Sequence, residues 1–260
     1  MIPAFRAELI KLWRPRTVLF GAAVVLLFAL GSAAAGVLTA QPAGSAADGP
    51  TVETFARADG GTLAFTSAAS FVGSFLLAVF AGAVGVEFSR GTFRTMLMRQ
   101  PGRIRFLAGK MAALLLLVAV ALAAATAASW VASLLFARAE GIDTAAWISW
   151  AGLRAALGDY GMVLLTVIGW AVLGMALGVG VPSVPVALGI GVGWAGPVEQ
   201  VFGEAWSPAA DWFPGLLLES LLDPDPGGPS STRALVTVGA YCLIALVGTA
   251  VVIRRRDVTS

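Results

Sequence analysis

Five stretches of 20 or more consecutive residues contain no charged side chain: 17–38, 66–86, 111–137, 161–181 and 234–253. A helix of about 20 apolar residues crosses the ~30 Å hydrocarbon core of a bilayer. Each stretch is therefore predicted to be a membrane-spanning helix. Hydrophobic residues make up 58% of the chain and charged residues only 12%, which is too apolar for a water-soluble domain. The 17 basic and 15 acidic residues nearly cancel, so nucleic-acid binding is not expected.

A sixth span is predicted at 184–202, although its sequence is less regular. Pro185 and Pro197 are expected to interrupt its hydrogen bonds, and Glu199 lies near one end. This segment is predicted to be a broken or re-entrant helix. The predicted fold is an all-α integral membrane protein with six transmembrane helices, in which residues 1–260 form a single transmembrane domain.

The lysines and arginines predict the orientation of these spans. With the N-terminus inside the cell, thirteen of the seventeen lie in cytoplasmic segments, as expected when basic loops stay in the cytoplasm. Both termini are then cytoplasmic. The composition is rich in Ala, Gly and Arg and poor in Lys, which is typical of a high-GC bacterial source. We therefore expect a multi-pass protein of a bacterial cytoplasmic membrane.

Residues 1–16 are predicted to form an amphipathic helix that lies in the membrane surface. Ile2, Phe5, Leu9, Leu12 and Trp13 recur at helical intervals opposite basic residues. The alternative is an ordinary flank on the water side of the first span. A cleaved signal peptide is disfavoured, because the apolar stretch exceeds the usual 7 to 15 residues.

Two outer segments are long enough to have structure of their own. Residues 39–65 are rich in Gly, Ala, Pro and Asp and are predicted to form a flexible loop. Residues 203–233 place tryptophans and a short apolar run among acidic residues. That pattern predicts short re-entrant helices that dip into the outer interface before the last span.

Two residue types limit the chemistry of the chain. It contains no histidine and a single cysteine, Cys242, so a Ser-His-Asp triad, a histidine metal site and an intrachain disulfide are all excluded. We expect no catalytic residue and no metal site. A phosphate-binding Gly-x4-Gly-Lys-Ser/Thr loop is also missing from the sequence.

The loop at 87–110, between the second and third spans, carries the most informative pattern. Ser89 or Thr92 can cap a short helix that ends at Pro101 and Gly102. Glu87 is expected to position this helix by pairing with a cation such as Arg90 or by capping backbone amides. The helix presents an apolar face and a neighbouring basic face, which would suit docking on another protein. Its apolar face is formed by Phe93, Met96 and Leu97 and its basic face by Arg90 and Arg94.

This loop resembles the ABC-2 family of exporter permeases. The matching positions are Glu87, Gly91, Thr92, Leu97, Pro101, Arg103, Gly109 and Lys110, while Phe93 replaces the usual leucine. The six-span plan, the amphipathic N-terminal helix and the structured outer segment also resemble this family. The resemblance therefore extends over nearly the whole chain.

The resemblance implies that the loop is a coupling helix, which docks on a separate nucleotide-binding ATPase subunit. ATP and Mg²⁺ would be bound by that subunit, and this chain would pair with a second copy of itself or a homologous permease. The coupling residues would be Glu87, Arg90, Gly91, Thr92, Phe93, Arg94, Met96, Leu97, Arg99 and Pro101. The alternative is a basic loop that only sets the topology.

Four polar residues are candidates for lining a transport pathway: Ser67, Ser70, Ser74 and Glu199. The three serines form a stripe at helical spacing, which could instead hydrogen-bond a neighbouring helix. Glu199 could instead be solvated at the outer interface.

The expected function is ATP-driven export of an amphipathic or hydrophobic molecule, such as a drug, peptide or lipid. An ATP-independent secondary transporter or channel is the alternative. A membrane enzyme is the third hypothesis, and the absence of histidine makes it the weakest.

Overall fold

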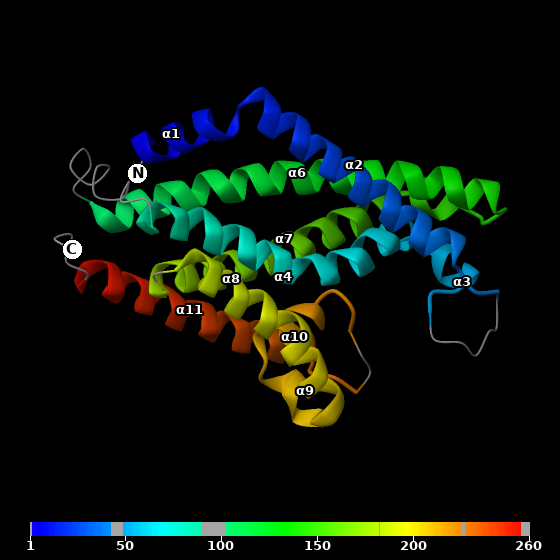
Figure 1. The fold of residues 1–260 in the computed structure, drawn as a ribbon. Coiled ribbons are helices and arrows are strands. Elements are labelled where there is room, and N and C mark those ends of the chain that lie inside the picture. Colours follow the sequence, from blue (N-terminus) through cyan, green and yellow to red (C-terminus); the bar gives the residue numbers. More distant parts are fainter. Residues whose placement is uncertain (1, 43–48, 90–101, 182, 225–226, 256–260) are drawn as a thin grey trace. The chain divides into compact units, whose positions relative to one another are not determined.

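The computed structural model describes residues 2–42, 49–89, 102–181, 183–224 and 227–255. These residues form helices joined by short turns, and an isolated β-bridge pairs Gln41 with Thr51. Figure 1 follows the helices from the N-terminal α1 to the C-terminal α11. Their bounds are α1 Ile2–Leu12, α2 Pro15–Leu38, α3 Val52–Phe55, α4 Gly60–Ser89, α6 Arg103–Ala139, α7 Trp150–Gly180, α8 Val184–Gly193, α9 Glu199–Ala205, α10 Pro214–Glu219 and α11 Ser231–Arg255.

Four helices of the described residues are long and apolar enough to cross a membrane, namely α2, α6, α7 and α11. A fifth candidate is α4 if its two bent parts, Gly60–Gly73 and Phe75–Glu87, form one span. The chain therefore has the helices of a multi-pass membrane protein. The predicted spans 17–38, 66–86, 111–137 and 234–253 lie within α2, α4, α6 and α11.

The predicted sixth span at 184–202 is divided in the structure. It consists of α8, a π-helical turn at Trp194–Val198 that contains Pro197, and the first part of α9. The irregularity expected at Pro197 is confirmed. The expectation for Pro185 is wrong, because this residue lies in the first turn of α8, where no hydrogen bond depends on its missing N–H. None of these pieces is a candidate span by itself, so six spans remain a prediction.

Two predicted boundaries differ from the structure. The helix that contains most of the predicted fifth span, α7, begins at Trp150 and not near Gly161. Asp159 therefore lies inside α7. Residues 39–65 are not simply a loop, because they contain α3 and the start of α4 at Gly60. Thr51 begins α3 by accepting a hydrogen bond from the Thr54 N–H. Short helices are also present in 203–233: the end of α9, a 3₁₀ turn at Ser207–Asp211, and α10.

The chain forms two compact units. Unit 1 comprises Met1–Leu9, Ser70–Leu115 and Leu165–Ser260, and unit 2 comprises Ile10–Ala69 and Leu116–Leu164. Each contains parts of several helices.

In unit 2, an outer core forms around two aromatic residues. Phe55 of α3 and Trp147 of the 3₁₀ turn Ala145–Ile148 are almost completely buried with Val37, Ala137 and Ile142. The indole Nε1 of Trp147 donates to the Phe55 carbonyl oxygen at 2.8 Å, so the polar atom of this buried ring is satisfied. This hydrogen bond holds together two residues that are 92 positions apart in the sequence.

In unit 1, α4 and α7 approach each other closely through two glycines. A Cβ at Gly174 would lie 2.4 Å from the Leu77 carbonyl oxygen, and one at Gly178 would lie 2.4 Å from that of Ala81. Side chains at these positions would therefore separate the two helices. Elsewhere in unit 1, α10 packs against α11. Phe213, which precedes α10, makes edge contacts with Trp194, Phe202 and Trp206.

Candidate functional site

Three helices of unit 1 meet at a buried lysine. Lys110 of α6 is 2% exposed, and its ammonium Nζ donates to Glu8 Oε1 of α1 at 2.7 Å and to Glu87 Oε1 of α4 at 2.8 Å. Glu8 is 7% exposed and Glu87 is 5% exposed. We refer to Glu8, Lys110 and Glu87 as the ion triad.

The ion triad fixes geometry more than it adds net stability. Removing charged groups from water carries a large desolvation penalty, and short hydrogen bonds between opposite charges offset it. Breaking such a buried pair by removing one partner is strongly destabilising, by about 3–5 kcal/mol. The three helices are therefore held in one arrangement at this point.

A second contact joins the same part of α6 to α11. The guanidinium Nη1 of Arg103 donates to the backbone carbonyl of Ile253 at 3.0 Å. Ile253 lies in the last turn of α11, where helix carbonyls have no partner within the helix. Phe106 and Leu107, one turn further along α6, are buried. The start of α6 is thus packed and hydrogen-bonded on several sides.

The structure partly fits the role expected for Glu87. A nearby cation was expected to pair with it, and Lys110 does so; Arg90 lies outside the described residues. The sequence motif ends at Lys110 but does not indicate that Lys110 pairs with Glu87. Glu8 is not part of any sequence motif described above. Its signal is that it is the sole acidic residue among the first 16, on the buried side of α1 with Ala4.

The predicted coupling helix falls in the segment between α4 and α6. Its residues Arg90, Gly91, Thr92, Phe93, Arg94, Met96, Leu97, Arg99 and Pro101 lie outside the described residues. The chain is described up to Ser89, two residues after Glu87, and again from Gly102, eight residues before Lys110. The ion triad therefore joins the two helices that flank this loop.

The predicted pathway residues are in different surroundings. Ser70 helps to line a cavity of about 150 Å³ with Trp170 and Gly215. Ser67 is exposed, and the side chain of Ser74 is not described. A pathway through them remains a prediction.

Glu199 is fully buried. The alternative that it is solvated at the outer interface is therefore wrong. Its Oε2 accepts a hydrogen bond from the backbone N–H of Leu216 at 3.0 Å. Gly215 leaves room for the carboxylate, since a Cβ there would lie 2.3 Å from Oε2. Glu199 thereby connects α9 to the first turn of α10.

Residues 49–192, more than half of the chain, match the model of a family described as "Protein of unknown function (DUF2705)". The chain belongs to this family. The DUF2705 match includes Glu87, the loop at 90–101 and Lys110, whereas Glu8 precedes it. No curated protein matches the chain.

Proposed function

We propose that the chain is the transmembrane subunit of an ATP-driven ABC-2 type exporter in a bacterial cytoplasmic membrane. Its cargo would be an amphipathic or hydrophobic molecule, such as a drug, peptide or lipid. A separate nucleotide-binding subunit would bind ATP and Mg²⁺, because this sequence contains no phosphate-binding loop. Two copies of the chain, or one copy and a homologue, would enclose the pathway.

The ion triad is the observation that supports this proposal best. Glu87 and Lys110 lie on the two helices that flank the loop expected to dock on the ATPase, and Glu8 joins both to α1. A force applied to that loop would act on α4 and α6 together, because separating them breaks a buried ion pair. The triad would therefore make α4 and α6 move together when a partner pulls on the segment between them.

Reconstitution with the cognate ATPase subunit tests the proposal. The two proteins should co-purify as a complex with two copies of each, and proteoliposomes should export cargo with ATP but not with a non-hydrolysable analogue. The chain alone should hydrolyse no ATP. Transport that proceeds unchanged without the ATPase subunit would contradict the proposal.

One observation favours the alternative of an ATP-independent secondary transporter. Asp159 is a half-buried carboxylate inside α7, and an ionisable residue within a membrane span is a candidate carrier of a coupling ion. This alternative predicts that a proton or sodium gradient drives uptake or efflux by the chain alone. The Asp159→Asn variant would then abolish transport.

A further inference from the structure

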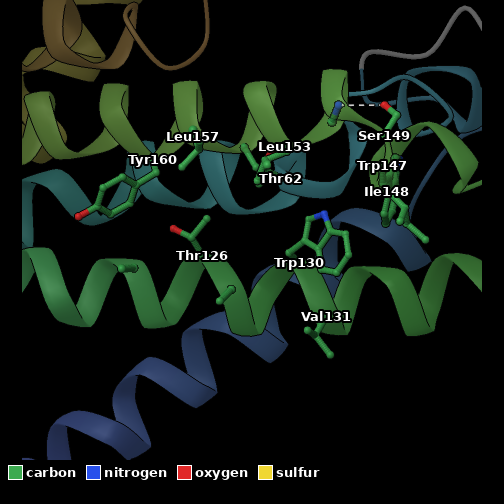
Figure 2. A pocket seen from close by; sticks show the side chains of 14 residues that line it. Thr62, Thr126, Trp130, Val131, Trp147, Ile148, Ser149, Leu153, Leu157 and Tyr160 are labelled. Atoms are coloured by element: carbon green, nitrogen blue, oxygen red, sulfur yellow. Dashed lines mark hydrogen bonds between the residues drawn. The ribbon is translucent and has the colours of Figure 1, made fainter.

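Unit 2 contains a large cavity that has no role in the proposed coupling to ATP hydrolysis. Its volume is about 630 Å³, within the range of pockets that enclose a drug-sized molecule. It lies between α4, α6 and the first half of α7. Figure 2 shows Thr126 and Trp130 of α6 and Tyr160 of α7 facing the space between those two helices, with Thr62 of α4 behind them.

The aromatic walls of the cavity are held in place by contacts outside it. The Trp147 indole N–H donates a hydrogen bond to the Phe55 carbonyl oxygen. The Tyr160 hydroxyl donates a hydrogen bond to the Ala119 carbonyl oxygen at 3.2 Å. Trp130 packs on Gly61, where a Cβ would lie 2.5 Å from its Nε1. Because these rings are already positioned, a ligand would not have to order them.

The rim of the cavity carries exposed apolar side chains. Val131 and Ile148 line it and are 50% and 64% exposed, and Leu157 is 61% exposed. These side chains belong to or adjoin the candidate spans α6 and α7. The cavity edge is therefore continuous with apolar surface of the kind that faces lipid.

The charged residues near the cavity indicate the charge of a ligand that would bind there. None of the described residues lining the cavity is charged, but the Thr62 hydroxyl on its wall donates to the Asp159 carboxylate. Asp59 adds a second negative charge near Asp159. Within the described part of the chain, no lysine or arginine forms an ion pair with Asp159. Aromatic faces and a carboxylate that no basic side chain pairs with both attract cations.

We propose that this cavity binds a drug-sized lipophilic cation that enters from the membrane. The aromatic and aliphatic walls would hold its apolar groups, and Asp159 would attract its charge through the Thr62 side of the cavity. The proposal requires neither the ATPase subunit nor the coupling loop.

Two ions of the same shape and opposite charge provide the probe. Tetraphenylphosphonium is a lipophilic cation, and tetraphenylborate is its anionic counterpart. Equilibrium binding would be measured on the full chain in nanodiscs of uncharged lipid, with each signal corrected for empty nanodiscs. We expect saturable binding of tetraphenylphosphonium and none of tetraphenylborate. Equal saturable binding of both ions would overturn the charge assignment.

Two neighbouring alanines of α6 locate the binding site. Ala123 and Ala124 are both exposed, but only Ala123 lines the cavity. The Ala123→Phe variant should lose saturable tetraphenylphosphonium binding, because its ring fills the cavity, whereas Ala124→Phe should bind as the parent does. Binding retained by both variants would place the cation elsewhere and refute the proposal.

The Asp159→Asn variant tests the charge, since an amide oxygen can still accept the Thr62 hydrogen bond. It should weaken tetraphenylphosphonium binding by about tenfold, as loss of a nearby opposite charge predicts. Unchanged affinity would show that the carboxylate does not attract the ligand. All these measurements omit ATP and the ATPase, so cation binding without ATP-driven export would reject only the proposed function. Export without cation binding would reject only this inference.

Discussion

Replacing Lys110 with methionine leaves the carboxylates of Glu8 and Glu87 buried without the ammonium between them. We expect this variant to lose about 3–5 kcal/mol of stability, seen as a lower midpoint of thermal unfolding in detergent. Arg105→Met is the matched control, since Arg105 lies on the same helix but is exposed; its effect should stay within about 0.5 kcal/mol.

The neutral triple variant Glu8→Gln, Glu87→Gln, Lys110→Met separates charge from packing. It removes both carboxylates together with the ammonium, so it should be more stable than Lys110→Met alone. If the single and triple variants unfold at the same temperature, the ion triad does not hold these helices through charge.

At the residue scale, sequence prediction reaches only as far as a local pattern carries information. Glu87 was singled out because it follows the predicted second span and begins the motif at 87–110. Glu8 was not, because its partner Lys110 is 102 positions away and helical periodicity describes only near neighbours. An acidic residue in an otherwise basic amphipathic helix is the signal that could have revealed it.

At the scale of helices, the close approach of α4 and α7 gives a matched pair of variants. Gly178→Ala places a Cβ 2.4 Å from a backbone oxygen of α4, whereas a Cβ at Gly180 meets nothing within 4 Å. We expect Gly178→Ala to lower stability by about 1–3 kcal/mol and Gly180→Ala to change it little. Equal unfolding midpoints for both variants would contradict this helix contact.

The predicted coupling loop at 87–110 supplies the next prediction. Phe93→Ala or Leu97→Ala should abolish co-purification of the ATPase subunit without reducing membrane insertion, because truncating a buried anchor typically removes about 2 kcal/mol or more of binding. Arg99→Gln should leave assembly largely intact, since charges at an interface rim mainly affect association rate. If the two apolar variants keep full association, the loop acts as a topology signal.

Helix ends were harder to predict than helix positions. An uncharged run marks where a chain can cross a bilayer, but a helix continues as long as its backbone hydrogen bonds and packing allow. Thus α6 begins at Arg103 rather than at Met111, and α7 begins at Trp150 although Arg154 and Asp159 follow. The start of α4 at Gly60 was also not predicted, because the Gly, Ala, Pro and Asp content of residues 39–65 indicated a loop.

For the whole molecule, the distribution of basic residues predicts the topology. Cysteines at positions 45 and 228 should be outside the cell, and those at 102 and 260 inside. In a Cys242→Ala background, an impermeant maleimide added to intact cells should label only the first two. Position 102 should become reactive once the cells are permeabilised. Labelling of that position from outside would invert the topology and place the loop on the wrong side for an ATPase.

The sequence distance between Glu8 and Lys110 also has a consequence during synthesis. A ribosome adds about 5–20 residues per second, so Lys110 is made roughly 5–20 s after Glu8. Throughout that interval the nascent chain contains the Glu8 carboxylate of α1 but not the Lys110 ammonium that will pair with it. The ion pair that attaches α1 to α6 can therefore form only after Lys110 has been made, and a nascent chain stalled before Lys110 would lack this contact.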